Sequence, residues 1–73
     1  MIEIPYSKNN EESMRMFYES LSEKDRRRYA GIEAIKLGHG GQTYISEVLG
    51  CDLKTIREGM TDLEDEKEIK KNE

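Results

Sequence analysis

The sequence predicts an all-α fold, a small bundle of about four helices that contains a helix-turn-helix. Apolar residues recur at three- and four-residue spacing, glycines separate the apolar segments, and the single proline, Pro5, lies near the N-terminus. The length of 73 residues allows one domain. We expect an extended arm or loop over residues 1–10, the helical domain over residues 11–63, and a charged tail over residues 64–73, either a fraying helical extension or disordered.

The first helix is predicted over residues 11–21. Its apolar stripe follows the spacing i, i+3, i+4 and i+7, and consists of Met14, Phe17, Tyr18 and Leu21. Asn9 or Asn10 is the expected N-cap, because a side-chain oxygen at that position can accept a hydrogen bond from the first turn.

The second helix is predicted to begin at Ser22, to run to Leu37 and to end at Gly38. Residues 22–25 resemble a capping box, and glycine commonly ends a helix in the left-handed conformation. Two apolar stripes predict a helix packed between partners, with its alanines allowing close approach. The stripes are Tyr29, Ile32 and Ile35 on one side, and Ala30, Ala34 and Leu37 on the other.

The third and fourth helices are joined by a glycine turn. The third is predicted over residues 42–49 and ends at Gly50, and Asp52 is the expected N-cap of the fourth. The predicted inward side of the fourth helix consists of Leu53, Ile56, Met60 and Leu63. The turn resembles that of a DNA-binding helix-turn-helix, although a helical hairpin without a DNA role has a similar pattern. The space between the two helices is expected to hold Ile45, Ser46, Leu49, Cys51 and Ile56.

The fourth helix is the expected recognition helix, which would enter the major groove of double-stranded DNA. A helical wheel directs Lys54, Glu58 and Thr61 outward, with Thr55 and Arg57 on the flanks. Lys54 and Arg57 can contact guanine edges or phosphates, and Thr55 a phosphate or a thymine methyl. Glu58 is interpreted as a surface partner of Lys54, with acceptance from cytosine N4 as the alternative.

Further candidates for DNA contact lie on the second and third helices. Successive helical residues are about 100° apart, so a run of three arginines cannot face one surface, and one or two of them are expected to touch phosphate. Tyr44 can contact the DNA backbone or pack internally. The full predicted contact set is Arg26, Arg27, Arg28, Thr43, Tyr44, Lys54, Thr55 and Arg57.

Charge favours a second hypothesis, a protein-interaction module that dimerises through residues 14–21. The net charge of −4 argues against a nucleic-acid partner. Residues 22–60, however, hold seven basic and six acidic side chains, so the centre is the least acidic part.

The sequence gives no indication of an enzyme. Cys51 is the single cysteine and His39 the single histidine, so neither an internal disulfide nor a zinc site formed by these two residues alone is expected. No cofactor, small-molecule substrate or membrane partner is predicted, and a start without a signal peptide favours a cytoplasmic protein.

Four segments closely resemble one family, the N-terminal region of ISAzo-type insertion-sequence transposases. They are LSEKDRRRYA at 21–30, IEAIKLGHGG at 32–41, YISEVLGC at 44–51 and KTIR at 54–57. The resemblance implies a helix-turn-helix that recognises the ends of a mobile element, followed by a DDE catalytic domain.

The thirteen residues after Met60 cannot supply that domain. The chain is therefore expected to be an excised domain, a truncated transposase or a stand-alone regulator. Glu58 departs from the basic residue that the family implies, which bears on binding strength and site preference.

Overall fold

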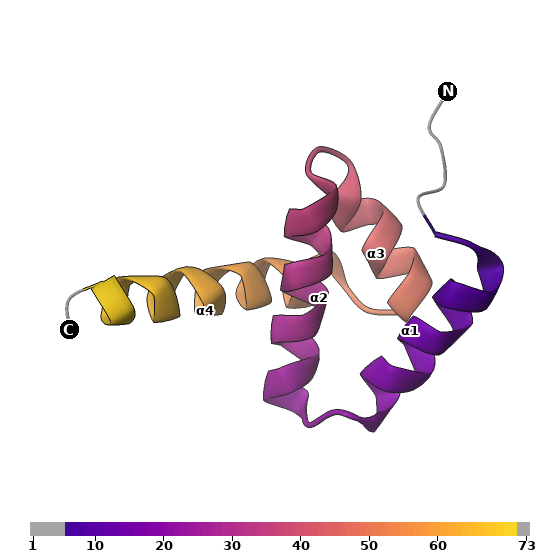
Figure 1. Ribbon diagram of the computed structural model, residues 1–73, viewed down its shortest axis with the longest axis horizontal. Coiled ribbons are helices and arrows are strands. Elements are labelled where there is room, and N and C mark those ends of the chain that lie inside the picture. Colours follow the sequence, from indigo (N-terminus) through magenta and orange to yellow (C-terminus); the bar gives the residue numbers. More distant parts are fainter. Residues whose placement is uncertain (1–5, 72–73) are drawn as a thin grey trace.

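Four helices account for most of the chain in the computed structural model, which describes the backbone of residues 6–71 and the side chains of residues 6–66. They are α1 (Lys8–Ser20), α2 (Glu23–Leu37), α3 (Gly41–Leu49) and α4 (Leu53–Lys71), with no strand among the described residues (Figure 1). The predicted all-α bundle is confirmed. The first five residues of the predicted arm and the last two of the predicted tail lie outside the described residues.

Helix α1 begins earlier than predicted because a different residue caps it. The side-chain oxygen of Ser7 accepts a hydrogen bond from the Asn10 amide at 3.2 Å, whereas Asn9 and Asn10 are already helical. The prediction of an asparagine cap was therefore wrong. Met14 and Tyr18 pack against the core, but the Phe17 side chain is 52% exposed, so only part of the predicted stripe faces inward.

Helix α2 has the predicted ends but not the predicted burial. Ser22 accepts from the Asp25 amide at 3.3 Å, and Gly38 ends the helix at a φ of 72°. One stripe is covered: Ala30 and Ala34 are buried and Leu37 is partly buried. Ile32 and Ile35 on the other stripe are 44% and 45% exposed. The prediction of a helix covered on both sides was wrong, because the neighbouring helices leave these two isoleucines uncovered.

Helices α2 and α4 cross with their backbones in contact. A Cβ atom added to Gly59 would overlap the carbonyl oxygen of Arg27, and one added to Gly31 would lie 2.8 Å from the Gly59 carbonyl carbon. The close approach was attributed above to the alanines of α2, but the structure places it at these two glycines. A side chain at either position would push the helices apart.

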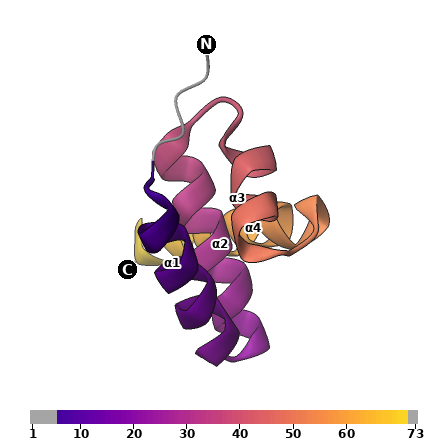
Figure 2. The same ribbon diagram turned by 90° about the vertical axis from the view of Figure 1, so that its right-hand side faces the viewer.

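The buried core lies where α2, α3 and α4 meet. Its members are between 0% and 2% exposed, and are Ala30, Ala34, Ile45, Leu49 and Ile56. Helix α4 continues well past α2, and Arg28 of α2 holds this extension through an ion pair of 2.5 Å to Glu66 (Figure 1). The tail is thus helical as far as Lys71. Figure 2 shows α3 beside α2, so that α2 braces the unit formed by α3, its turn and α4.

Candidate nucleic-acid interface

The turn between α3 and α4 depends on Gly50. This residue has φ 69° and ψ 37°, a left-handed conformation that glycine adopts without a steric penalty. The carbonyl oxygen of Ser46 accepts from the amides of both Gly50 and Cys51, at 2.9 and 3.1 Å, which closes the end of α3. Among the described residues, the Asp52 carboxylate makes no hydrogen bond to the first turn of α4. The predicted side-chain cap is therefore not observed. The Asp52 carbonyl instead accepts from the Ile56 amide at 3.3 Å. The chain therefore bends sharply before α4 begins.

The predicted filling residues do pack between the two helices. Ile45 and Ile56 are fully buried, Leu49 is nearly so, and half-buried Cys51 packs against them. Burial raises the pKa of the Cys51 thiol, which keeps it protonated at neutral pH. This packing fixes α4 relative to α3.

The first two turns of α4 present cationic side chains to solvent. Lys54 and Arg57 are exposed, and Thr55 is half-buried. Arg57 Nε donates to the side-chain oxygen of Gln42 at 3.4 Å, which ties the guanidinium to the first turn of α3. Thr43 follows in that turn and is exposed. The structure thus connects the first turn of α3 with the second turn of α4.

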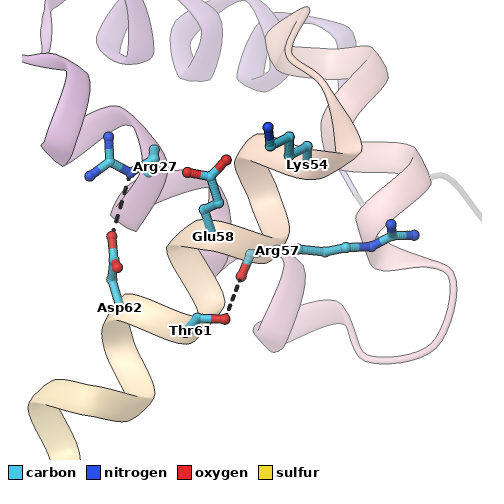
Figure 3. A pocket seen from close by; sticks show the side chains of 6 residues that line it. All are labelled: Arg27, Lys54, Arg57, Glu58, Thr61 and Asp62. Atoms are coloured by element: carbon cyan, nitrogen blue, oxygen red, sulfur yellow. Dashed lines mark hydrogen bonds and ion pairs between the residues drawn. The ribbon is translucent and has the colours of Figure 1, made fainter.

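A shallow hollow of about 320 Å³ lies along α4 and is completed by α2 (Figure 3). Its lining residues are Arg27, Lys54, Arg57, Glu58, Thr61 and Asp62. Arg27 Nε pairs with Asp62 at 3.5 Å, and the Thr61 hydroxyl donates to the Arg57 carbonyl at 3.0 Å. Lys54 and Glu58 do not form the predicted ion pair: among the described residues, neither has an ion-pair partner within 4.0 Å.

The three consecutive arginines point to three different partners, as the helical spacing predicts. Arg26 binds the end of α1: its Nε donates to the Tyr18 carbonyl at 3.1 Å and another guanidinium nitrogen to the Glu19 carbonyl at 2.6 Å. Arg28 pairs with Glu66 at 2.5 Å. Of the three, only Arg27 lines the hollow beside Lys54.

Tyr44 packs α3 against α1. Its hydroxyl donates to a Glu11 carboxylate oxygen at 2.5 Å, and its ring centroid lies 6.2 Å from that of Tyr6. Burial, together with the hydrogen bond to Glu11, raises the pKa of Tyr44 to about 12. Of the two roles considered for Tyr44, the structure shows internal packing.

Two arginines have neighbours that sequence reasoning missed. Arg15 of α1 lies over the turn, where a Cβ atom added to Gly50 would be 2.9 Å from its guanidinium. Arg27 joins Lys54 in the hollow although 27 positions separate them. Both contacts depend on how distant helices pack, and local spacing carries no signal for them.

Metal-ligand groups and membrane spans are both absent from the part of the chain that the structure describes. That part of the chain contains no group of three or more histidine, cysteine, aspartate or glutamate side chains placed to hold a metal ion. No helix in it is both long enough and apolar enough to cross a membrane. Comparison with protein-family models, curated proteins and solved structures finds no match to this chain.

Proposed function

We propose that α3, the Gly50 turn and α4 form a helix-turn-helix that binds double-stranded DNA, with α4 entering the major groove. The observation that carries the proposal is the turn itself. It redirects the chain before α4, which packs against α2 on its inner side, while Lys54 and Arg57 on the outer side are exposed. The first turns of a recognition helix are the part that contacts base edges.

The contacts divide into those that provide affinity and those that provide sequence choice. Thr43 follows Gln42 in the first turn of α3, and Gln42 accepts from Arg57 of α4. A phosphate of the groove edge would pass at this contact, and Arg27 adds a cation from α2. Lys54 is the cation best placed for a base edge, because it lies in the first turn of α4 and has no ion-pair partner among the described residues. Arg26 and Arg28 contribute to the fold through their internal partners.

The biological target that we propose is the end of a mobile element. Support comes from the sequence segments between residues 21 and 57 that resemble ISAzo-type transposases. In this proposal the chain recognises DNA without performing strand transfer, either as the recognition region of a transposase or as a regulator that competes for the same ends.

The test is a fluorescence-anisotropy titration of the full chain with duplex DNA at two salt concentrations. Lys54→Ala and Arg57→Ala should each weaken binding, and each lost phosphate contact should reduce the dependence of log K on log salt by about one. Lys8→Ala removes the same charge from exposed α1 and is the matched control. Absence of binding at low salt, or an equal loss in Lys8→Ala, contradicts the proposal.

A second candidate function is self-association through the exposed apolar residues of α1 and α2. Met16 is 70% exposed, and the exposed ring of Phe17 lies across the edge of Tyr29 with centroids 5.1 Å apart. Ile32 and Ile35 extend this surface along α2. Sedimentation at several concentrations tests the oligomeric state. In amide-shift mapping with DNA, changes confined to residues 14–21 favour this function, and changes in residues 43–57 favour DNA binding.

A further inference from the structure

Glu58 lies at the centre of the proposed DNA-facing surface. It is exposed in the second turn of α4, one turn after Lys54 and one turn before Asp62. Figure 3 shows its carboxylate projecting from α4 into the space between Arg27 and Lys54. An acidic side chain in this position repels phosphate, so on a surface that binds DNA through charge alone it would only weaken the complex.

The cations around Glu58 do not neutralise it. Arg27 pairs with Asp62 at 3.5 Å, and Arg57 donates to Gln42 at 3.4 Å. Lys54 shares the hollow with Glu58, yet the two form no ion pair. The carboxylate oxygens of Glu58 therefore keep their capacity to accept hydrogen bonds from a ligand.

The major groove offers two amino groups to an acceptor, cytosine N4 and adenine N6. Adenine presents the acceptor N7 beside N6, and a carboxylate has no proton to give it, so adenine is a poor match. In a C·G pair, the N4 donor lies beside the O6 and N7 acceptors of guanine. The acceptor Glu58 and the donor Lys54, one helical turn apart, have the complementary pattern.

We propose that Glu58 sets the sequence preference of α4 by accepting a hydrogen bond from N4 of a cytosine, while Lys54 donates to the guanine of the same base pair. This inference rests on the proposed DNA-binding function and names the feature of the DNA that the site selects. It also assigns a role to Glu58, which, unlike Asp62 in the same hollow, has no ion-pair partner among the described residues.

The experiment is selection of binding sites from a randomised duplex at low salt, using the full chain and three variants. The wild type should enrich cytosine at one position, by about tenfold or more over the other bases. Glu58→Gln should shift that position to adenine, because a glutamine amide can donate to N7 and accept from N6. Glu58→Ala should lose the preference there and bind random-sequence DNA more tightly than the wild type.

Glu64→Gln is the matched control, since Glu64 is exposed on α4 but does not line the hollow. It removes the same charge and should leave the cytosine preference unchanged. A preference that survives in Glu58→Gln and Glu58→Ala overturns this inference but not DNA binding. A wild-type chain that enriches no cytosine overturns it as well. A chain that binds no duplex at all overturns the proposed function together with it.

Discussion

Gly59 occupies a position where the fold leaves no room for a side chain. It is buried where α4 crosses α2, with the carbonyl oxygen of Arg27 occupying the space of a Cβ atom. Glycine in a helix interior normally lowers helix stability by about 1 kcal/mol relative to alanine. Here the close backbone contact, which only glycine permits, stabilises the protein by more than the low helix propensity of glycine costs.

We therefore expect Gly59→Ala to destabilise the protein by about 3 kcal/mol, the upper part of the usual range for overpacking a core. Urea unfolding followed by circular dichroism measures the free energy of unfolding. Gly38→Ala is the comparison: Gly38 has a positive φ of 72° but no atom within 4 Å of an added Cβ. Strain alone should cost about 1 kcal/mol there. A smaller loss in Gly59→Ala than in Gly38→Ala would show that the helices can separate easily.

At the scale of the element, α1 is attached without a buried residue of its own. The side chains of Met14 and Tyr18 rest on the core, Glu11 accepts from Tyr44, and Arg26 of α2 binds the carbonyl groups at the end of α1. A guanidinium at this end also complements the negative end of the helix dipole. Polar contacts at its two ends thus make a large contribution to holding α1.

Arg26→Ala should release the C-terminal end of α1, with a loss of about 2 kcal/mol for the charged hydrogen bonds. Hydrogen exchange resolved by residue checks this, because the amides of α1 should exchange faster while those of α3 and α4 stay protected. Arg26→Lys keeps the charge but not the planar pair of donors, so it should restore the protection only in part. Lys24→Ala, an exposed change on α2, should have no effect on exchange in α1.

At the scale of the whole molecule, all four tyrosines have raised pKa values; three lie in α1, α2 and α3, and Tyr6, ahead of α1, donates to Glu33 of α2. Burial is the first cause for each, and brings the pKa of Tyr29 and of Tyr44 to about 12. The folded state therefore keeps these protons after the unfolded state, with a tyrosine pKa of 10.0, has lost them. The resulting stabilisation is complete below pH 10 and is lost as the pH rises through about 12.

We expect the chain to unfold in alkali across this window, which tyrosinate absorbance and circular dichroism can follow together. Glu11→Gln removes the negative charge beside the Tyr44 hydroxyl and should lower the pKa of that tyrosine. Glu12→Gln makes the same change at an exposed neighbouring position and serves as the control. Identical titration curves for the two variants would contradict the assigned cause.

The parts of this fold that local chemistry decides could be predicted from the sequence. Ser22 and Gly38 bound α2 as predicted, and Gly50 breaks the chain where a left-handed residue is needed. The cap of α1 was missed because several adjacent polar residues can each act as a cap. The exposure of Ile32 was missed because the 3.6-residue period marks an apolar side of a helix without showing whether another helix covers it.

The candidate site divides in the same way. The exposed positions of Lys54 and Arg57 follow from the helical wheel of one segment. The internal roles of Arg26 and Arg28, and the place of Arg27 beside α4, depend on distant contacts. A signal for the crossing was present: Gly31 and Gly59 are isolated glycines inside helical patterns, and such glycines often mark close packing.

The glycine crossing also bears on how the proposed recognition surface can diverge. Main-chain atoms, and not interlocking side chains, set the distance between α2 and α4 at that point. The exposed positions of α4, such as Lys54 and Glu58, lie outside this anchor and outside the core. Substitutions there can accumulate without repositioning the helix, so related chains could acquire new DNA targets while conserving one scaffold.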